Sequence, residues 1–188
     1  MKKVLLVLAI CAAPFLFSSC EMDDDGSILG AFIGNMKVTI DGAQHNFDGV
    51  AYYEEGEYSG IACTKMDSTH ESVAIVLRGK GVGEYTLGFA KSMNPLDLIN
   101  ANFSNIDEMS TVAYMPSSDA YADSYITVAG TCNITSVTDS KVVGNFTGYA
   151  VKVSDLQSIS LSILQNAKAI SGTFSATNGN SLADIFSK

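Results

Sequence analysis

The sequence predicts an all-β fold, an antiparallel β-sandwich of about ten strands, with a closed or partly open β-barrel as the alternative. Three observations support this prediction. Short runs in which apolar and polar residues alternate recur along the 188 residues, the runs are rich in β-branched and aromatic side chains, and Gly, Asp or Ser separates most of them. Alternation does not distinguish a sandwich from a barrel, because both bury one face of each strand.

The first predicted element is a hairpin near the start of the globular region. Residues 36–40 alternate apolar and polar side chains, and Asp41-Gly42 is typical of a two-residue hairpin turn. The chain then returns through Gln44 and Phe47, which gives the second strand of the pair.

Four further strands are predicted in the middle of the chain, at residues 58–64, 71–78, 83–89 and 111–114. In the third of them, Tyr85, Leu87 and Phe89 share one face, which we expect to be buried. The glycine-rich residues 79–83 join two strands, so they are interpreted as a turn and not as a phosphate-binding loop.

The second half of the chain contains the clearest predicted hairpin, formed by residues 125–135 and 141–151 around a turn at residues 138–140. A last pair of strands is predicted at residues 159–164 and 169–176. Both pairs continue the pattern of short strands that the first half establishes.

Two segments of this half are alike. Residues 144–148 (Gly-Asn-Phe-Thr-Gly) are echoed by residues 172–176 (Gly-Thr-Phe-Ser-Ala), and we expect two strands with similar packing, since two copies are too few for a repeat architecture. Helices are predicted only at residues 94–100, with Pro95 in the first turn, and at residues 181–186.

The N-terminus has the layout of a secretory signal peptide. Lys2 and Lys3 precede an apolar run over residues 4–17, and two serines stand directly before Cys20. The run is shorter than the roughly 20 apolar residues that a membrane-spanning helix needs. The sequence therefore predicts export, with residues 1–19 removed as a signal peptide.

Residues 16–20 (Leu-Phe-Ser-Ser-Cys) resemble the lipobox of bacterial lipoproteins, in which the cysteine thiol receives a diacylglycerol before cleavage makes it the first residue. Phe17 stands where leucine is usual. The resemblance implies that Cys20 carries acyl chains such as palmitate. At about 0.8 kcal/mol per buried methylene, about two or three such chains give stable attachment to a membrane. An ordinary signal peptide with a coincidental cysteine is the alternative.

The segment that begins at Cys20 is strongly acidic. Removal of residues 1–19 deletes two lysines and no acid, which shifts the net charge from −9 to −11. Residues 20–35 form a polar tether with Glu21 and three consecutive aspartates, which resembles the surface-export signal of lipoproteins in the Bacteroidota type of Gram-negative bacterium. We therefore expect a lipid-anchored protein of the outer membrane, exposed at the cell surface, with a periplasm-facing protein as the alternative. The few scattered cations exclude a nucleic-acid partner.

Two cysteines, Cys63 and Cys132, lie in the globular region, which we take as one domain of residues 36–188. An oxidising compartment permits a disulfide between them. Each also shares a strand face with an apolar neighbour, Ile61 or Ile134, which favours two small buried side chains instead. Two cysteines alone do not make a zinc site.

No catalytic motif is present, so we expect a protein that is not an enzyme and that carries no cofactor. His45 and His70 stand beside turn or loop residues, and no nucleophile of recognisable signature accompanies them. An acid pair such as Asp107-Glu108 would serve a glycoside hydrolase only with carboxylates about 5 to 9.5 Å apart across a substrate. Solvated loop acids are the simpler interpretation.

Two loop segments suggest modification or ion binding. Asp67-Ser68-Thr69 resembles the short motif at which such bacteria attach O-glycans, here on Ser68, and an Asx turn is the alternative. Asp119, Asp123 and Ser124 offer oxygen ligands for calcium but match no EF-hand spacing, so no metal is predicted.

Tyrosine is the remaining candidate for ligand contact, because it combines an apolar ring with a polar tip. Two groups of tyrosines flank the acidic loop at residues 54–57 and the loop at residues 115–123. Such rings can stack on sugars, and the alternative is that they cap the ends of the core. The predicted ligand-binding residues are Tyr52, Tyr53, Tyr58, Tyr114, Tyr121 and Tyr125.

Four strand and turn segments of the globular region have a distinctive order. They are Lys-Val-Thr-Ile-Asp-Gly at residues 37–42, Gly-Val-Gly-Glu-Tyr-Thr-Leu-Gly at 81–88, Gly-Thr-Cys-Asn-Ile-Thr at 130–135 and Val-Gly-Asn-Phe-Thr at 143–147. In this order the region resembles an uncharacterised family of small Bacteroidota-type lipoproteins with an all-β domain of unknown function. The resemblance implies the compartment and the fold, and it brings no functional residues.

Together these observations predict a non-catalytic lipoprotein of the cell envelope that binds a glycan or an envelope protein through its tyrosine-bearing loops. One alternative is a calycin-like barrel that encloses an apolar small molecule, as lipocalins do. The other is a hydrolase that uses loop carboxylates.

Overall fold

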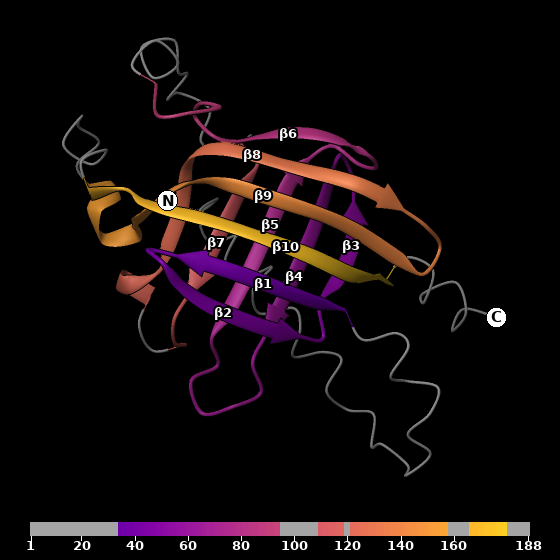
Figure 1. Cartoon of the computed structure of the whole chain (residues 1–188), viewed down its shortest axis with the longest axis horizontal. Helices are drawn as coiled ribbons and strands as arrows, with labels where there is room; N and C mark the ends of the chain where they lie inside the picture. The colour runs from indigo at the N-terminus through magenta and orange to yellow at the C-terminus, as the bar shows by residue number, and fades with distance from the viewer. Residues whose placement is uncertain (1–33, 95–108, 119–120, 158–165, 180–188) are drawn as a thin grey trace.

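The computed structural model describes residues 34–94, 109–118, 121–157 and 166–179 (Figure 1). Several predictions fall outside these residues: the signal peptide at 1–19, Cys20 and most of its tether, the helices near 95–100 and at 181–186, the strand at 159–164, and the acids Asp107, Glu108 and Asp119. Within the described part of the chain, no helix combines the length and the apolar character needed to cross a membrane.

The all-β prediction is confirmed, and the described residues form ten strands. The strands are β1 (Asn35–Ile40), β2 (Ala43–Asp48), β3 (Ala51–Glu55), β4 (Tyr58–Thr64), β5 (Ser72–Arg78), β6 (Gly83–Gly88), β7 (Thr111–Met115), β8 (Tyr125–Val137), β9 (Lys141–Lys152) and β10 (Lys168–Asn178). Two short 3-10 helices, η4 (Tyr121–Asp123) and η5 (Val153–Gln157), precede β8 and follow β9.

Seven of the strands close into a barrel, in the order β3-β4-β5-β7-β8-β9-β10. The ring closes where β10 runs parallel to β3 and pairs Thr177 with Ala51 and Asn178 with Tyr52. The other six pairings around the ring are antiparallel. The architecture is therefore the barrel alternative, because a sandwich would leave the two sheets unconnected at their edges.

The other three strands widen the barrel wall. β1 and β3 pair with the same edge of β10, β2 continues outward from β1, and β6 and β7 pair with the same edge of β8. The barrel is consequently flattened into two layers. One layer consists of β2, β1, β10, β9, β8 and β6, and β3, β4, β5 and β7 cross behind it (Figure 1).

Strand β8 belongs to both layers and bends between them. Its first residues pair with β7, and residues from Ala129 onward pair with β6. The register with β9 shifts between Thr127 and Ala129, which is the mark of a β-bulge that bends a strand. At the bend, Gly130 has a φ of 150°, and a Cβ there would lie 2.3 Å from the carbonyl oxygen of Thr147. Only glycine fits this close crossing.

The hairpin of β1 and β2 confirms the first predicted turn. Asp41 and Gly42 have φ values of 49° and 82°, as a type I′ turn requires at both central residues. The register pairs Ile40 with Ala43, so the inward residues of β1 all point into the core. Turn chemistry thus sets which face of this hairpin is buried.

The two similar segments lie side by side in β9 and β10. In their antiparallel register Phe146 is opposite Gly172, and Phe174 is opposite Gly144. A Cβ on Gly172 would lie 2.5 Å from the ring of Phe146, and one on Gly144 would lie 2.4 Å from the ring of Phe174. Each buried ring therefore occupies the space left by a missing side chain on the next strand, which is the similar packing that the sequence predicts.

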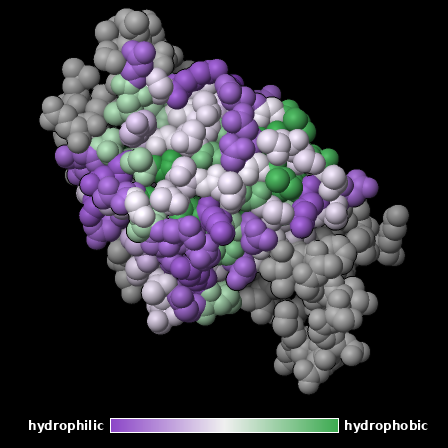
Figure 2. Space-filling model, viewed as in Figure 1, coloured by the Kyte–Doolittle hydropathy of each residue, from purple (hydrophilic) through white to green (hydrophobic). Residues whose placement is uncertain are grey.

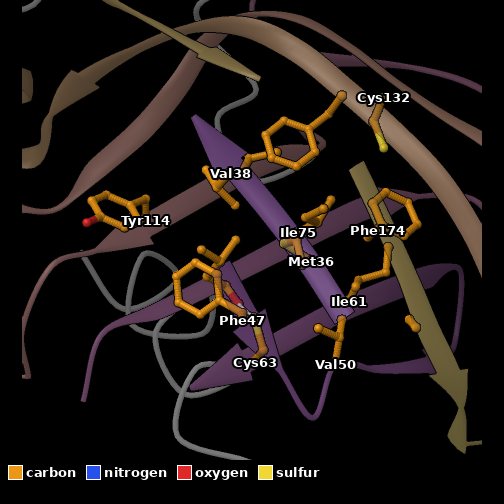
Figure 3. Packing of buried hydrophobic residues seen from close by; sticks show 14 of the residues in the cluster. Met36, Val38, Phe47, Val50, Ile61, Cys63, Ile75, Tyr114, Cys132 and Phe174 are labelled. Atoms are coloured by element: carbon orange, nitrogen blue, oxygen red, sulfur yellow. Dashed lines mark hydrogen bonds between the residues drawn. The ribbon is translucent and has the colours of Figure 1, made fainter. Parts of the chain in front are cut away.

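One hydrophobic cluster fills the space between the two layers and takes side chains from all ten strands. Met36 and Ile75 lie near its centre, with Phe47 on one side and Phe174 on the other (Figure 3). Each such side chain contributes roughly 1.5–3 kcal/mol when it leaves water. This cluster is the main source of the barrel's stability.

Cys63 and Cys132 lie in this cluster as reduced thiols, and the disulfide offered as one alternative is not formed. Cys63 is on β4 and Cys132 on β8, and the two lie well apart in the cluster (Figure 3). Burial raises the pKa of the Cys132 thiol to about 12, so it stays protonated and unreactive. Both cysteines therefore act as small buried side chains.

Strand β3 is missing from the sequence prediction. Alternation predicts a loop at residues 54–57, yet Glu54 and Glu55 belong to β3. The side chain of Tyr52 on this strand is fully buried, and its hydroxyl donates a hydrogen bond to Glu54 Oε1 at 2.6 Å. Because two tyrosines followed by two glutamates do not alternate, the sequence pattern gives no strand signal here.

Candidate functional site

The strongest candidate for ligand contact lies at one open end of the barrel. At this end, β7 finishes just after Tyr114, β8 starts at Tyr125, β9 finishes at Lys152 and β10 starts at Lys168. The register pairs Tyr114 with Tyr125, and Tyr125 with Lys152. We call this the Tyr125 end, defined by those four residues.

An open depression of about 240 Å³ lies at the Tyr125 end. It is smaller than the roughly 300–1,000 Å³ of a typical small-molecule site, so it has room for one sugar-sized group. The ring of Tyr125 forms one wall and also packs against the hydrophobic core, which fixes its position. The lining residues are Tyr125, Lys152, Asp155, Asn166, Ala167 and Lys168.

Both lysines of the depression are held by acids that lie outside it. Lys152 Nζ is 2.6 Å from Asp123 Oδ1, and Lys168 Nζ is 2.9 Å from Asp41 Oδ2. These hydrogen bonds raise the pKa of both lysines, so both remain charged at neutral pH. With an aspartate and an asparagine also in the lining, hydrogen-bond donors and acceptors surround the tyrosine ring.

A buried carboxylate lies behind Tyr125. The ring of Tyr114 is 6.4 Å from that of Tyr125, and the Tyr114 hydroxyl donates a hydrogen bond to Glu71 Oε1 at 2.5 Å. His45 Nδ1 lies 2.6 Å from the same oxygen, and Lys65 pairs with Oε2. The Glu71 side chain is only 8% exposed, so these three partners replace the water that it loses. We call these four polar residues the Glu71 cluster.

The contacts within the Glu71 cluster set its protonation states. Burial alone raises the pKa of the Glu71 carboxyl, but hydrogen bonds from Lys65 and Tyr114 and the charges of His45 and Lys65 outweigh burial and lower it. Burial, together with the neighbouring carboxylate, raises the pKa of Tyr114 far above its ordinary value. At neutral pH Glu71 is therefore ionised and Tyr114 is a neutral donor, an arrangement that positions Tyr114 and, through its ring, Tyr125.

The six predicted tyrosines do not form one surface. Tyr52, Tyr53 and Tyr58 lie on β3 and β4, away from the Tyr125 end. Burial and the contact with Glu54 raise the pKa of Tyr52 to about 12. The structure brings Tyr114 and Tyr125 together, with Tyr114 in the core and Tyr125 in the depression. The side chain of Tyr121 lies outside the described part of the chain.

Ser68 is exposed in the loop between β4 and β5. Asp67 Oδ1 accepts a hydrogen bond from the backbone N–H of Thr69 at 2.9 Å and another from its hydroxyl at 2.5 Å. This is the Asx turn given above as the alternative, and the two hydrogen bonds lower the pKa of Asp67. The turn leaves Ser68 at the surface.

Among the residues that the structure describes, no group of three His, Cys, Asp or Glu side chains is placed to hold a metal ion. Asp123, considered above as an oxygen ligand for calcium, pairs with Lys152 instead.

Neither the Glu71 cluster nor most of the depression is predicted from the sequence. A signal for the cluster was present, since His45 shares the inward face of its strand with Phe47, and a polar residue on a buried face needs a partner. Which residues supply the partner depends on how β2 meets the β4–β5 loop and β7, and alternation does not contain that information. Lys152, Asp155 and Lys168 come from strand ends and turns that carry no motif.

No protein-family model, curated protein or solved structure matches the chain.

Proposed function

We propose that the protein is a non-catalytic lipoprotein of the cell envelope that binds a sugar residue of a larger glycan in the depression at the Tyr125 end. Acyl chains on Cys20 hold it in the outer membrane, and the barrel faces the outside of the cell. The observation that carries the proposal is the depression itself, where a fixed tyrosine ring stands among charged and amide groups.

The chemistry of the lining favours a sugar over an apolar molecule. A sugar ring presents an apolar face that packs on an aromatic ring, and its hydroxyls both donate and accept hydrogen bonds. Lys152 and Lys168 supply donors, Asp155 supplies acceptors and Asn166 supplies both. The ligand is placed at the rim because the side chains of the hydrophobic cluster fill the interior of the described barrel.

The N-terminal segment supports the proposed attachment. The chain from Cys20 to the start of β1 at Asn35 is 15 residues long and spans at most about 50 Å when extended. That reach is enough to hold the barrel just beyond the headgroups while it engages a glycan.

Replacement of Tyr125 tests the binding site. The probe is an array of neutral and acidic oligosaccharides, followed by calorimetric titration with each sugar that binds. We expect Tyr125→Ala to weaken binding about tenfold, because it removes the stacking surface. Replacement of the exposed Asn166 by alanine should weaken binding by about the same factor, because it removes hydrogen bonds. Tyr58→Ala, which removes a tyrosine far from the depression, is the matched control and should bind like the parent. Parental affinity in both depression variants, or no sugar bound at all, would overturn the proposed site.

Replacement of Cys20 tests the anchor. In cells fed with labelled palmitate, the parent chain should take up label and sediment with the outer membrane, and protease added outside should digest it. Cys20→Ala should take up no label and leave the membrane fraction, because a single lipid-bearing residue supplies the attachment. The matched control is Cys63→Ala, which removes a buried thiol and should keep the label. An unlabelled parent protein would contradict the lipoprotein proposal and leave the sugar-binding result standing.

A further inference from the structure

The outward side of the larger layer carries a regular array of polar side chains, of which nine in twelve are the short Thr, Ser or Asn. The registers of six neighbouring strands align one residue of each in a single row. That row consists of Gln44, Thr39, Ser171, Thr147, Thr131 and Thr86. A second row, two residues away along each strand, consists of Asn46, Lys37, Thr173, Asn145, Asn133 and Glu84. We call the two rows the threonine face.

The spacing of the threonine face is set by the sheet. Neighbours within a row are about 4.8 Å apart, and the two rows are roughly 6.7 Å apart. One row across six strands is therefore about 24 Å long, the length of about four or five sugar units in an extended glycan. Every side chain in both rows is exposed or half-buried.

Acidic residues are absent from the centre of this face. Strands β1, β8, β9 and β10 contain no aspartate or glutamate, although the whole chain has 20 acids against 11 basic residues. The first row carries no charge at all. Figure 2 looks onto this face and shows pale, near-neutral residues in its middle between more hydrophilic patches. The middle of the face therefore presents neutral hydrogen-bonding groups, and unlike the rest of an acidic surface it does not repel a weakly anionic polymer.

An exposed aromatic ring adjoins the rows. Tyr149 on β9 is 40% exposed and follows Thr147 by two residues, on the same side of the strand. Its cross-strand neighbours are Ala169 and Ala129, so the ring stands above small side chains. A raised tyrosine beside rows of hydroxyls offers stacking and hydrogen bonding to one extended ligand.

Sheet stability alone does not account for this composition. Threonine favours strands, and cross-strand threonine pairs add roughly 0.2–1 kcal/mol each, but pairs of opposite charge add as much and improve solubility. Short side chains have a different advantage, because Thr, Ser and Asn lose little rotational freedom when a ligand covers them, whereas Lys and Glu lose much. The composition therefore suits a surface that is covered by a partner.

We propose that the threonine face, with Tyr149 at its margin, binds an uncharged polysaccharide whose chain lies across the strands along the rows. Hydroxyls of successive sugar units exchange hydrogen bonds with the threonine, serine and asparagine side chains, and one unit stacks on Tyr149. This surface is separate from the depression at the Tyr125 end and does not need it.

Affinity electrophoresis of the whole chain tests the proposal. The gels contain galactomannan, mixed-linkage glucan or dextran as uncharged probes, with dextran sulfate as an anionic probe. We expect at least one uncharged polymer to retard the parent protein. Thr147→Glu combined with Thr173→Glu places two long charged groups in the middle of the face and should weaken binding about tenfold or more. Tyr149→Ala should weaken it about fivefold.

Two further variants separate binding from folding and from charge. Thr147→Val combined with Thr173→Val keeps shape and strand propensity and removes only hydroxyls, so it should melt like the parent and still bind more weakly. Met66→Glu adds a charge at a loop residue that is 78% exposed and lies off the face, and it should bind like the parent. The proposal is overturned if the valine variant binds like the parent, if only dextran sulfate retards the protein, or if Tyr125→Ala abolishes polymer binding while the face variants leave it intact.

Discussion

A buried carboxylate destabilises a protein unless other groups replace its water, and Glu71 has three such groups. Its partners come from separate parts of the chain: His45 from β2, Lys65 from the loop after β4 and Tyr114 from β7. These polar contacts are therefore also tertiary links, which tie the hairpin of β1 and β2 to the back layer. The half-exposed lysine and histidine keep the cost of burial small compared with a fully enclosed ion pair.

Replacement of Glu71 should weaken this link in a pH-dependent way. We expect Glu71→Gln to lower the free energy of unfolding by about 1–3 kcal/mol at pH 7, because the neutral amide cannot balance the charge of Lys65. The folded pKa of Glu71 is lowered, so its contribution is complete above the ordinary value of 4.5 and is lost as the pH falls below that value toward the lowered one. Urea unfolding at pH 7, 5 and 3 measures the difference.

The control for this experiment is Glu57→Gln, which changes an exposed acid in the β3–β4 turn and should have little effect at any of the three pH values. If Glu71→Gln cost as much at pH 3 as at pH 7, the shape of the side chain and not its charge would be what matters.

At the scale of single elements, β9 and β10 pack so that each strand has a glycine where the other has a large ring. The phenylalanine of one strand covers the glycine of the other, and then the roles reverse two residues later. A glycine in a strand interior is normally unfavourable, since it has no side chain to pack. Here the adjacent ring supplies the missing contact, and the two glycines allow two large rings to lie on one narrow face.

Addition of one methyl group tests this exchange. In Gly172→Ala the new Cβ would lie 2.5 Å from both the ring of Phe146 and the carbonyl oxygen of Lys37, so the ring and one backbone must shift. We expect a loss of about 1–3 kcal/mol in the free energy of unfolding, as for other overpacked cores. Thermal unfolding followed by circular dichroism gives the value. Ser175→Ala on the outward side of the same strand is the control, with an expected change within about 0.5 kcal/mol. An unchanged melting temperature for Gly172→Ala would show that the rings yield freely.

At the scale of the whole molecule, the sequence predicts the hairpins between neighbouring strands and does not predict the pairing of strands that are far apart in the sequence. The hairpins of β1–β2 and β8–β9 follow from alternation and from turn residues such as Asp41-Gly42. Strand β3 escapes because its residues do not alternate. Barrel closure depends on the pairing of Ala51 with Thr177. Neither segment contains a sequence pattern that predicts its pairing partner.

The candidate site has the same division. Tyr125 is found from composition, because a tyrosine beside a polar loop suits a ligand. Its companions Lys152 and Lys168 are found only from the structure, since they meet at the Tyr125 end through the register of three strands. The threonine face likewise exists only once six strands are aligned.

The closing pair of strands has a consequence for the order in which the protein folds. β10 is the last described strand, and it completes hydrogen bonding for both β1 and β3. A nascent chain that lacks β10 therefore cannot close the barrel. Pairing of β10 with β1 and β3 is also slow, because these strands are far apart in the sequence. Under the proposed export, this delay in folding is useful, because a polypeptide must remain unfolded while it crosses a translocation channel. The barrel can close only after β10 has crossed the membrane and can pair with β3.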